Sequence, residues 1–133
     1  MNSKIFDLLE KLEIEVVNLN SVEEQIQAVN FIREAISKIS PFEKEPIDCV
    51  KWIPADELEN NFNDISPEKE SELDLLHECI KSNGYTNPIL VYKIGNQKYE
   101  IADGLSASIV GKKYKDINER LHGYLPVVII NEF

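Results

Sequence analysis

The chain has 133 residues, 43% of them hydrophobic, which is enough for one domain with a buried core and excludes a disordered or low-complexity protein. Its net charge of −10 argues against a general DNA-binding protein, because the DNA phosphates would repel it. No apolar run is long enough to span a membrane, and the charged start MNSKIFDLLEKLEIE lacks the apolar core of a signal peptide.

The first 45 residues predict a helical hairpin. Ser3 is placed to cap the first helix, and Ser21 with Glu24 fits a capping box at the start of the second. The segment SPFEKEP (40–46) then interrupts the helical pattern with two prolines. Neither helix can bury its apolar stripe alone, so we expect the hairpin (1–45) to pack on the rest of the chain or on a second copy, as a homodimer. The stripe of the first helix consists of Ile5, Leu8, Leu9 and Leu12.

The second part of the chain alternates strand and helix patterns. The segment IDCVKWI (47–53) is rich in β-branched and aromatic residues and predicts a strand. The segment 66–84 predicts a helix, in which Ser66 is the cap, Pro67 occupies the first helical position and Gly84 ends the helix.

Further along, the segments 88–94 and 98–102 predict two strands joined in a hairpin at Gly95 and Asn96. After two helical segments, YLPVVII (124–130) predicts a buried last strand. This order of elements predicts an α+β fold with a small mixed sheet, preceded by the helical hairpin.

The stretch YEIADGLSASIVGKKY (99–114) predicts a strand that turns sharply into a helix at Asp103 and Gly104. Helix N-termini that follow such turns often bind anions through their free N–H groups. However, residues 105–108, which begin this helix, carry no charge. The turn is therefore a phosphate site, the remnant of one, or a structural turn only.

Acidic residues are concentrated in the first two thirds of the chain. Residues 1–83 contain 8 Lys/Arg and 19 Asp/Glu, whereas residues 84–133 contain 6 and 5. The single basic cluster is formed by Lys112, Lys113 and Lys115. A solvated helix end is the favoured interpretation of this cluster, and an anion-facing role for one lysine is the alternative.

Other residues that often carry chemistry are expected to be structural. Cys49 and Cys79 lie in apolar patterns without metal-type spacing, so we expect reduced core cysteines of a cytoplasmic protein. His77 and His122 have no partner at ligand spacing and are interpreted as surface or capping histidines. Trp52 falls within a strand pattern, which favours a core position over a base-stacking one.

Several motifs in the right order resemble the ParB N-terminal-like domain of the ParB/sulfiredoxin superfamily, over residues 46–133. They are VKWIPADELENNFND, the helix before Gly84, GYTNPILVY and YEIADGLSASIVGK. The ending RLHGYLPVVII, together with the N-terminal helices, is similar to the IbrB-like branch, described as co-activators of prophage gene expression. The resemblance implies a bacterial or phage-associated regulator with the superfamily's sheet.

One departure from the superfamily weakens the implied nucleotide site. Members typically carry Asp-Gly-Phe-His-Arg where this chain has Asp-Gly-Leu-Ser-Ala at residues 103–107. The His and Arg would add charge-assisted hydrogen bonds of about 1.5–3 kcal/mol each, so their loss implies an affinity lower by roughly 10²–10⁴-fold. Sulfiredoxins carry their catalytic cysteine in this turn, and Leu105 at that place implies no sulfinic acid reductase activity.

The resemblance implies a degenerate pocket for a nucleotide, ATP or CTP with Mg²⁺, and no catalytic residue or permanent metal site. Its expected lining is Thr86, Pro88, Ile89, Asp103, Gly104, Leu105, Ser106, Ala107, Ser108 and Lys112.

Three functions follow from these observations. The first is a transcriptional co-regulator that acts with a protein partner or the transcription machinery and binds DNA weakly or not at all. The second is a nucleotide-dependent kinase or nuclease, which would need Asp103 or Glu100 as a base or metal ligand. The third is an adaptor whose acidic helices bind a basic partner. The missing positive charge at the phosphate site favours the first and third over an enzyme.

Overall fold

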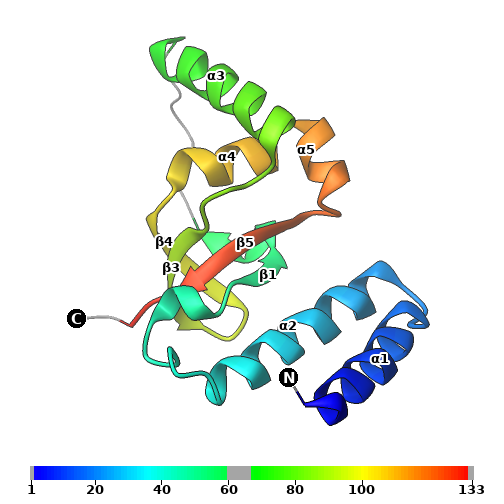
Figure 1. The fold of residues 1–133 in the computed structure, drawn as a ribbon. Helices are drawn as coiled ribbons and strands as arrows, with labels where there is room; N and C mark the ends of the chain where they lie inside the picture. Colours follow the sequence, from blue (N-terminus) through cyan, green and yellow to red (C-terminus); the bar gives the residue numbers. More distant parts are fainter. Residues whose placement is uncertain (1, 60–66, 132–133) are drawn as a thin grey trace.

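The chain forms a five-stranded mixed sheet with helices packed around it (Figure 1), in agreement with the predicted α+β fold. This computed structural model describes residues 2–59 and 67–131. Helices α3, α4 and α5 lie above the sheet in the view of Figure 1, and the α1–α2 hairpin lies below it, beside β1. Within the described ranges, no helix is long and apolar enough to cross a bilayer.

The boundaries of the elements follow from local signals in the sequence. The elements are α1 (Ser3–Val17), α2 (Val22–Lys38), β1 (Lys51–Pro54), β2 (Leu58–Glu59), α3 (Pro67–Asn83), β3 (Ile89–Gly95), β4 (Lys98–Asp103), α4 (Leu105–Lys113), α5 (Lys115–Arg120) and β5 (Tyr124–Ile129). Two short 3₁₀ turns, Pro46–Asp48 and Ala55–Glu57, flank β1.

The last strand of the chain occupies an interior position in the sheet. The strand order is β1-β5-β3-β4-β2, and β5 runs antiparallel to β1 and parallel to β3. Helices cover the sheet above and below, so the strand needs apolar residues on both faces. Leu125, Val127 and Val128 are each at most 1% exposed, which explains the continuous apolar run at 124–130.

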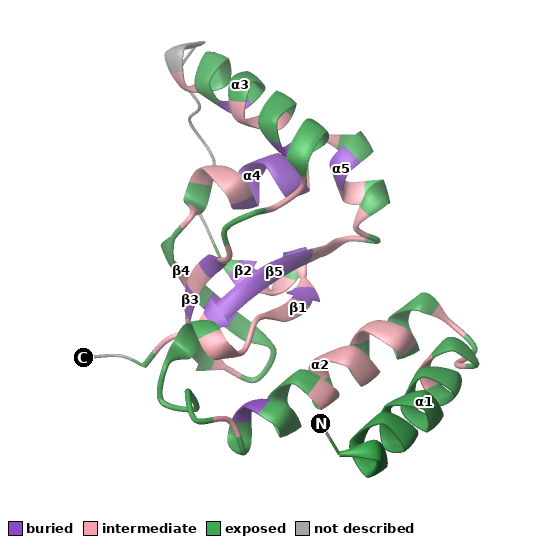
Figure 2. Ribbon diagram, in the orientation of Figure 1, coloured by how far each residue is buried: buried purple, intermediate pink, exposed green. Residues whose placement is uncertain are grey.

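Two adjoining apolar clusters form the core (Figure 2). One lies on the sheet and the other between α3, α4 and α5, and the side chains of Tyr85 and Leu121 pack against both. The sheet cluster contains Ile53, Ala55, Leu58, Ile89, Val91, Tyr99, Leu125 and Val127. The helical cluster contains Leu73, Ile80, Ile109, Val110 and Ile117.

Gly111 sets the distance between α4 and the sheet. A Cβ atom at this position would lie 2.3 Å from Leu125 Cδ2 and 2.8 Å from the Tyr85 hydroxyl, so any larger residue would clash. The Tyr85 hydroxyl donates a hydrogen bond of 2.7 Å to the Ala107 carbonyl, and burial raises the pKa of this phenol. These contacts fix α4 over β5.

The structure corrects three local predictions. Asn2, not Ser3, caps α1, because its side chain accepts a 2.8 Å hydrogen bond from the Lys4 N–H. The first strand begins only at Lys51, since Pro46–Asp48 forms a 3₁₀ turn instead. The proposed Ser66 cap lies outside the described residues.

The hairpin between β3 and β4 is confirmed, but its turn is shifted by one residue. Gly95 pairs with Lys98 and is the end of β3, so Asn96 and Gln97 form the turn. Gln97 adopts φ = 56°, the left-handed conformation that the tight turn requires.

The expected core position of Cys79 is wrong. Cys79 is exposed and Cys49 is half-buried. The buried face of α3 carries Leu73 and Ile80, and one residue along a helix is a rotation of about 100°, which turns Cys79 away from that face.

The N-terminal hairpin is attached to the sheet through polar contacts. The side chain of Asn30 on α2 donates to the Trp52 carbonyl at 2.7 Å and accepts from the Trp52 N–H at 2.9 Å. Because β1 is an edge strand, these backbone groups of Trp52 have no strand partner on that side. Asn30 thus satisfies the outer edge of β1 as a neighbouring strand would.

Substitution Asn30→Ala removes both hydrogen bonds, and we expect it to lower the free energy of unfolding by about 1–3 kcal/mol. Urea unfolding followed by the fluorescence of Trp52, the single tryptophan, measures this change. Glu34→Gln on the same helix is the control, because it removes only the exposed 3.4 Å ion pair with Lys51 and should change stability by less than about 0.5 kcal/mol. Equal stability of the two variants would contradict the docking role of Asn30.

Candidate functional site

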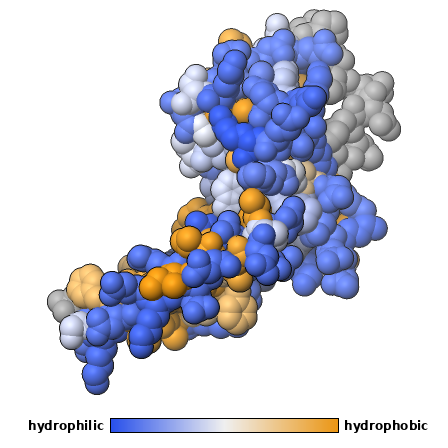
Figure 3. Space-filling view, turned by 90° about the vertical axis from the view of Figure 1, so that its right-hand side faces the viewer, coloured by the Kyte–Doolittle hydropathy of each residue, from blue (hydrophilic) through white to orange (hydrophobic). Residues whose placement is uncertain are grey.

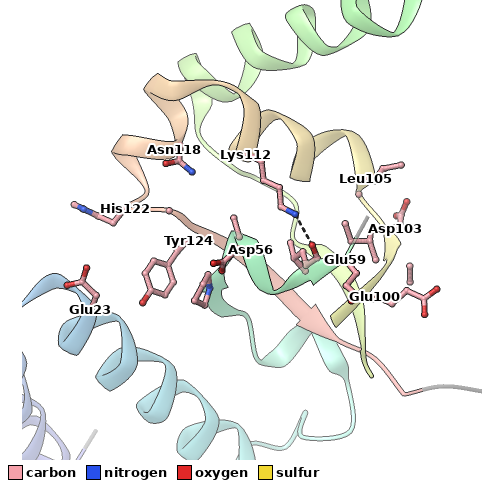
Figure 4. Close-up of a pocket in the computed structure, with 17 residues that line it drawn as sticks. Glu23, Asp56, Glu59, Glu100, Asp103, Leu105, Lys112, Asn118, His122 and Tyr124 are labelled. Carbon is pink, nitrogen blue, oxygen red and sulfur yellow. Dashed lines mark hydrogen bonds between the residues drawn. The ribbon is translucent and has the colours of Figure 1, made fainter. Parts of the chain in front are cut away.

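A cleft of about 1390 Å³ opens beside the first turn of α4 (Figure 4). Its walls come from segments that are far apart in the chain: the ends of β1 and β4, strand β2, helices α4 and α5, and the loop before β5. The lining residues are Glu23, Pro54, Ala55, Asp56, Leu58, Glu59, Glu100, Ile101, Ala102, Asp103, Gly104, Leu105, Lys112, Asn118, His122, Gly123 and Tyr124.

The Asp-Gly turn determines how α4 meets the cleft. Gly104 adopts φ = 96°, and a Cβ atom there would lie 3.3 Å from the Ile89 Cα, so the position favours glycine on both conformational and steric grounds. The N–H of Ser108 donates to the Gly104 carbonyl at 3.0 Å and is the first bond of the helix. The N–H groups that precede it have no carbonyl partner within the helix and form the partial positive charge of the N-terminus.

Carboxylates dominate the charge around this cleft. Five line it, namely Glu23, Asp56, Glu59, Glu100 and Asp103, against the single lysine Lys112. The carboxylate of Glu59 lies 2.9 Å from Lys98 Nζ in an exposed ion pair. Burial and the neighbouring Asp56 carboxylate raise the pKa of Glu57. The electrostatic potential in the cleft is therefore negative, which is unfavourable for an anion that has no bound cation.

Lys112 faces the cleft but bonds to the protein. Its Nζ donates a 2.8 Å hydrogen bond to the carbonyl of Leu58, drawn as a dashed line in Figure 4. Burial lowers the pKa of Lys112, and the nearby Asp56 carboxylate opposes that shift. The ammonium thus joins α4 to β2.

The other two lysines of the basic cluster point elsewhere. Lys113 Nζ lies 3.8 Å from Glu70 on α3, and Lys115 Nζ lies 3.6 Å from Glu119 one turn along α5. Because the three lysines diverge and each has an acidic or carbonyl neighbour, they do not form a common anion-binding surface.

The structure brings together only some of the residues expected to line a nucleotide pocket. Asp103, Gly104, Leu105 and Lys112 line the cleft. Ser106 and Ala107 are half-buried in the first turn of α4 and are not part of that lining.

The remaining expected residues lie apart from the cleft. Ser108 is fully buried, and its hydroxyl donates to the Leu105 carbonyl at 2.6 Å. Ile89 is buried in the sheet core. Thr86 and Pro88 line a separate cleft of about 420 Å³.

Sequence reasoning missed several residues of the cleft. Glu23 belongs to the first turn of α2, and His122 lies in the loop before β5 with φ = 56°. Asp56 follows β1 within a stretch quoted for the family resemblance, which is the one signal that could have pointed to it. Nothing in the spacing of Glu23 or His122 indicates that they approach the turn at Gly104.

The histidine on α3 has a structural role. His77 Nε2 lies 2.9 Å from the Asp116 carboxylate, and its ring stacks on Tyr114 at 4.0 Å. The hydrogen bond from His77 lowers the pKa of Asp116, and a hydrogen bond to Asp74 raises the pKa of Tyr114 to about 12. These side chains join α3 to α4 and α5. Over residues 2–59 and 67–131, no cluster of His, Cys, Asp and Glu has the geometry of a metal site.

The model of the ParB N-terminal domain matches residues 38–106, just over half of the chain. The chain belongs to the ParB N-terminal domain family. The match begins at the last residue of α2 and ends in the first turn of α4, so it includes the Asp-Gly turn and excludes most of the hairpin.

Two known proteins are similar to this ParB N-terminal domain protein. The uncharacterized protein YbdM of Escherichia coli (strain K12) is 37% identical over 111 residues, which are 81% of this chain and 52% of that protein. The chain thus spans about half the length of this relative. The C-terminally truncated chromosome-partitioning protein ParB from Caulobacter crescentus, complexed with CTP-gamma-S, matches with 19% identity and a TM-score of 0.46, over 63% of this chain and 45% of that one.

Substitution Lys112→Met tests whether this lysine acts as a structural contact. Leu58 is 2% exposed, so its carbonyl would lose a donor in a buried place, and we expect a loss of about 1–3 kcal/mol in unfolding free energy. Lys115→Met is the matched control, since its 3.6 Å ion pair with Glu119 is exposed and its loss should cost less than about 0.5 kcal/mol. Thermal and urea unfolding of both variants measure the difference, and a neutral Lys112→Met would contradict the assignment.

Proposed function

We propose that this chain is a ParB-like regulatory module, a transcriptional co-regulator, whose cleft is a weakened site for a nucleotide with Mg²⁺. The observation that carries the proposal is the composition of the cleft. The N-terminus of α4 opens onto a cavity large enough for a nucleotide, but five carboxylates surround it and positions 106 and 107 carry no cation.

The balance of charges explains why such a site would be weak. The free N–H groups and dipole of α4 favour a phosphate by about 0.3–1 kcal/mol near an exposed helix end. The carboxylates of Glu100 and Asp103 oppose a second anion in the same cleft. With Mg²⁺ bound, a nucleotide would carry less negative charge, so the metal complex is the form of the nucleotide that this cleft would accept.

The same features argue for a binding role over catalysis. Transfer of a phosphoryl group needs cations positioned on the charge that develops in the transition state. The cation at this cleft, Lys112, donates to the Leu58 carbonyl, and the family's His-Arg pair is replaced by Ser106 and Ala107. Enzymatic turnover of ATP or CTP would therefore overturn this part of the proposal.

The proposed regulatory role rests on the resemblance of the chain's ending, RLHGYLPVVII, to the IbrB-like branch. The family match covers residues 38–106 and does not include that ending. We infer a partner protein, or the transcription machinery itself, as the target of regulation. The excess of 24 acidic over 14 basic residues favours a protein partner with a basic surface over DNA.

Substitution of Ser106→His with Ala107→Arg restores the charged pair of the family. We expect an increase of about 10²-fold or more in affinity for ATP or CTP, provided that the two longer side chains extend from the half-buried positions 106 and 107 into the cleft, where they would add charge-assisted contacts. Calorimetric titration with Mg²⁺ present measures this increase over the weak or absent binding of the parent chain.

The control for this experiment is Ser82→His with Asn83→Arg, which adds the same two side chains at the exposed C-terminal end of α3. It should bind no better than the parent, which separates a local effect from a change in net charge. Negligible binding by a folded Ser106→His, Ala107→Arg variant would show that the turn is structural only.

Direct binding to random duplex DNA is expected to be weaker than about 1 μM at physiological salt. The reason is the net charge of −10 and the absence of a common basic surface among Lys112, Lys113 and Lys115. Fluorescence anisotropy with a labelled duplex measures the dissociation constant. A nanomolar value would instead indicate a regulator that contacts DNA without a partner.

A further inference from the structure

Exposed apolar side chains are concentrated on the N-terminal hairpin. Of the 16 large hydrophobic residues that are exposed in the described chain, 13 lie between Ile5 and Ile47. Helix α1 has no buried residue at all. Figure 3 shows apolar side chains gathered over the hairpin, whereas the face of the rest of the molecule in that view is mainly hydrophilic.

The exposed residues of α1 form a continuous stripe. Ile5, Leu8, Leu9 and Leu12 follow the spacing i, i+3, i+4, i+7 and are 49%, 65%, 45% and 37% exposed. Phe6 and Val17 extend the apolar surface to a neighbouring side of the helix and are 55% and 72% exposed. A helix that is apolar on two adjoining sides is typical of a bundle, in which each helix contacts two neighbours.

Within residues 2–59 and 67–131, the main neighbour of α1 is α2. The expected burial of the stripe is therefore not achieved within a single chain. Helix α2 also has exposed apolar residues, since Phe31, Ile36 and Ile39 are 74%, 59% and 80% exposed. Its opposite side is attached to the sheet through Asn30, so these residues remain available to a partner.

The exposed apolar area of the hairpin is large enough for a stable protein interface. With about 150–200 Å² for each large side chain, α1 alone presents on the order of 600 Å² of apolar surface, and the three residues of α2 add about 350 Å². A standard protein interface buries about 800 Å² on each partner. The hairpin supplies this area without contributions from the sheet.

One flank of α1 carries charges that are complementary to those of a second copy. Lys4, Lys11 and Glu15 are separated by seven and four residues, so they lie along one flank of the stripe. In an antiparallel pair of α1 helices, Lys4 of one chain lies opposite Glu15 of the partner subunit. Residues 1–40 contain 4 basic and 7 acidic residues, so most of the chain's excess negative charge lies outside this surface.

We propose that two copies of this chain associate through their α1–α2 hairpins, with the α1 helices antiparallel, as a homodimer with a four-helix interface. A two-fold axis uses the same surface on both subunits, which is why a single self-complementary stripe suffices.

Sedimentation equilibrium of the full chain tests the proposal. We expect a mass of twice 15.3 kDa at micromolar concentration. Leu8→Glu with Leu12→Glu should raise the dissociation constant at least about tenfold, because it places charges in the apolar interface. These residues are exposed in the single chain, so the variant should fold, which near-ultraviolet circular dichroism of Trp52 checks.

The matched control is Leu75→Glu with Ile94→Glu, which replaces two exposed apolar residues outside the hairpin and should leave the dimer intact. Lys4→Glu should weaken the dimer, and Lys4→Glu with Glu15→Lys should restore it. A monomeric full chain at about 100 μM, or a dimer unaffected by the α1 charges, would overturn the proposal. Neither result depends on nucleotide binding, so the proposed function is tested separately by the calorimetric titration.

Discussion

The position of β5 is the constraint on which the rest of the structure depends. The last strand pairs with β1 on one side and β3 on the other, so the sheet is complete only when the end of the chain has joined its first strand. Helix α4 is pressed against this strand at Gly111, where no Cβ atom fits beside Leu125. The start of β5 also forms one wall of the cleft through Gly123 and Tyr124. The insertion of β5 between β1 and β3 thus shapes both the hydrophobic core and the cleft.

The cleft is built on a backbone turn that the side chains at positions 106 and 107 do not hold in place. The backbone of the Asp-Gly turn is held by the conformation of Gly104 and by its approach to Ile89, neither of which depends on the residues at 106 and 107. Under the proposed function, the loss of a charged pair at these two positions would leave the Gly104 turn unchanged. Membership of the ParB N-terminal domain family determines the scaffold, and the side chains around it determine what it binds.

The hairpin is joined to this scaffold in an unusual way for an amphipathic pair of helices. Hydrogen bonds join it to the edge strand and to the turn before that strand, from Asn30 to Trp52 and from the Ser37 hydroxyl to Asp48 at 2.9 Å. Polar docking satisfies the edge of β1, and no residue of α1 is buried although α2 packs beside it. A second hairpin can therefore bind to α1 without competing with the sheet for the same surface.

The sequence by itself determined the family and the longer elements, but it did not predict β2 and it placed the start of β1 too early. The Ser21 cap, the start of α3 at Pro67, its end at Gly84 and the apolar run of β5 are signals that depend on residues within a few positions of each other. Of the cleft, the sequence predicted only the Asp-Gly turn and not the walls that face it. The hydrogen bond from Lys112 to Leu58 spans 54 positions, and Glu23, Asp56 and His122 reach the cleft from three different elements. Tertiary structure alone decided these neighbours, because strand order and the packing of α4 on β5 bring distant residues together, and no local pattern encodes them.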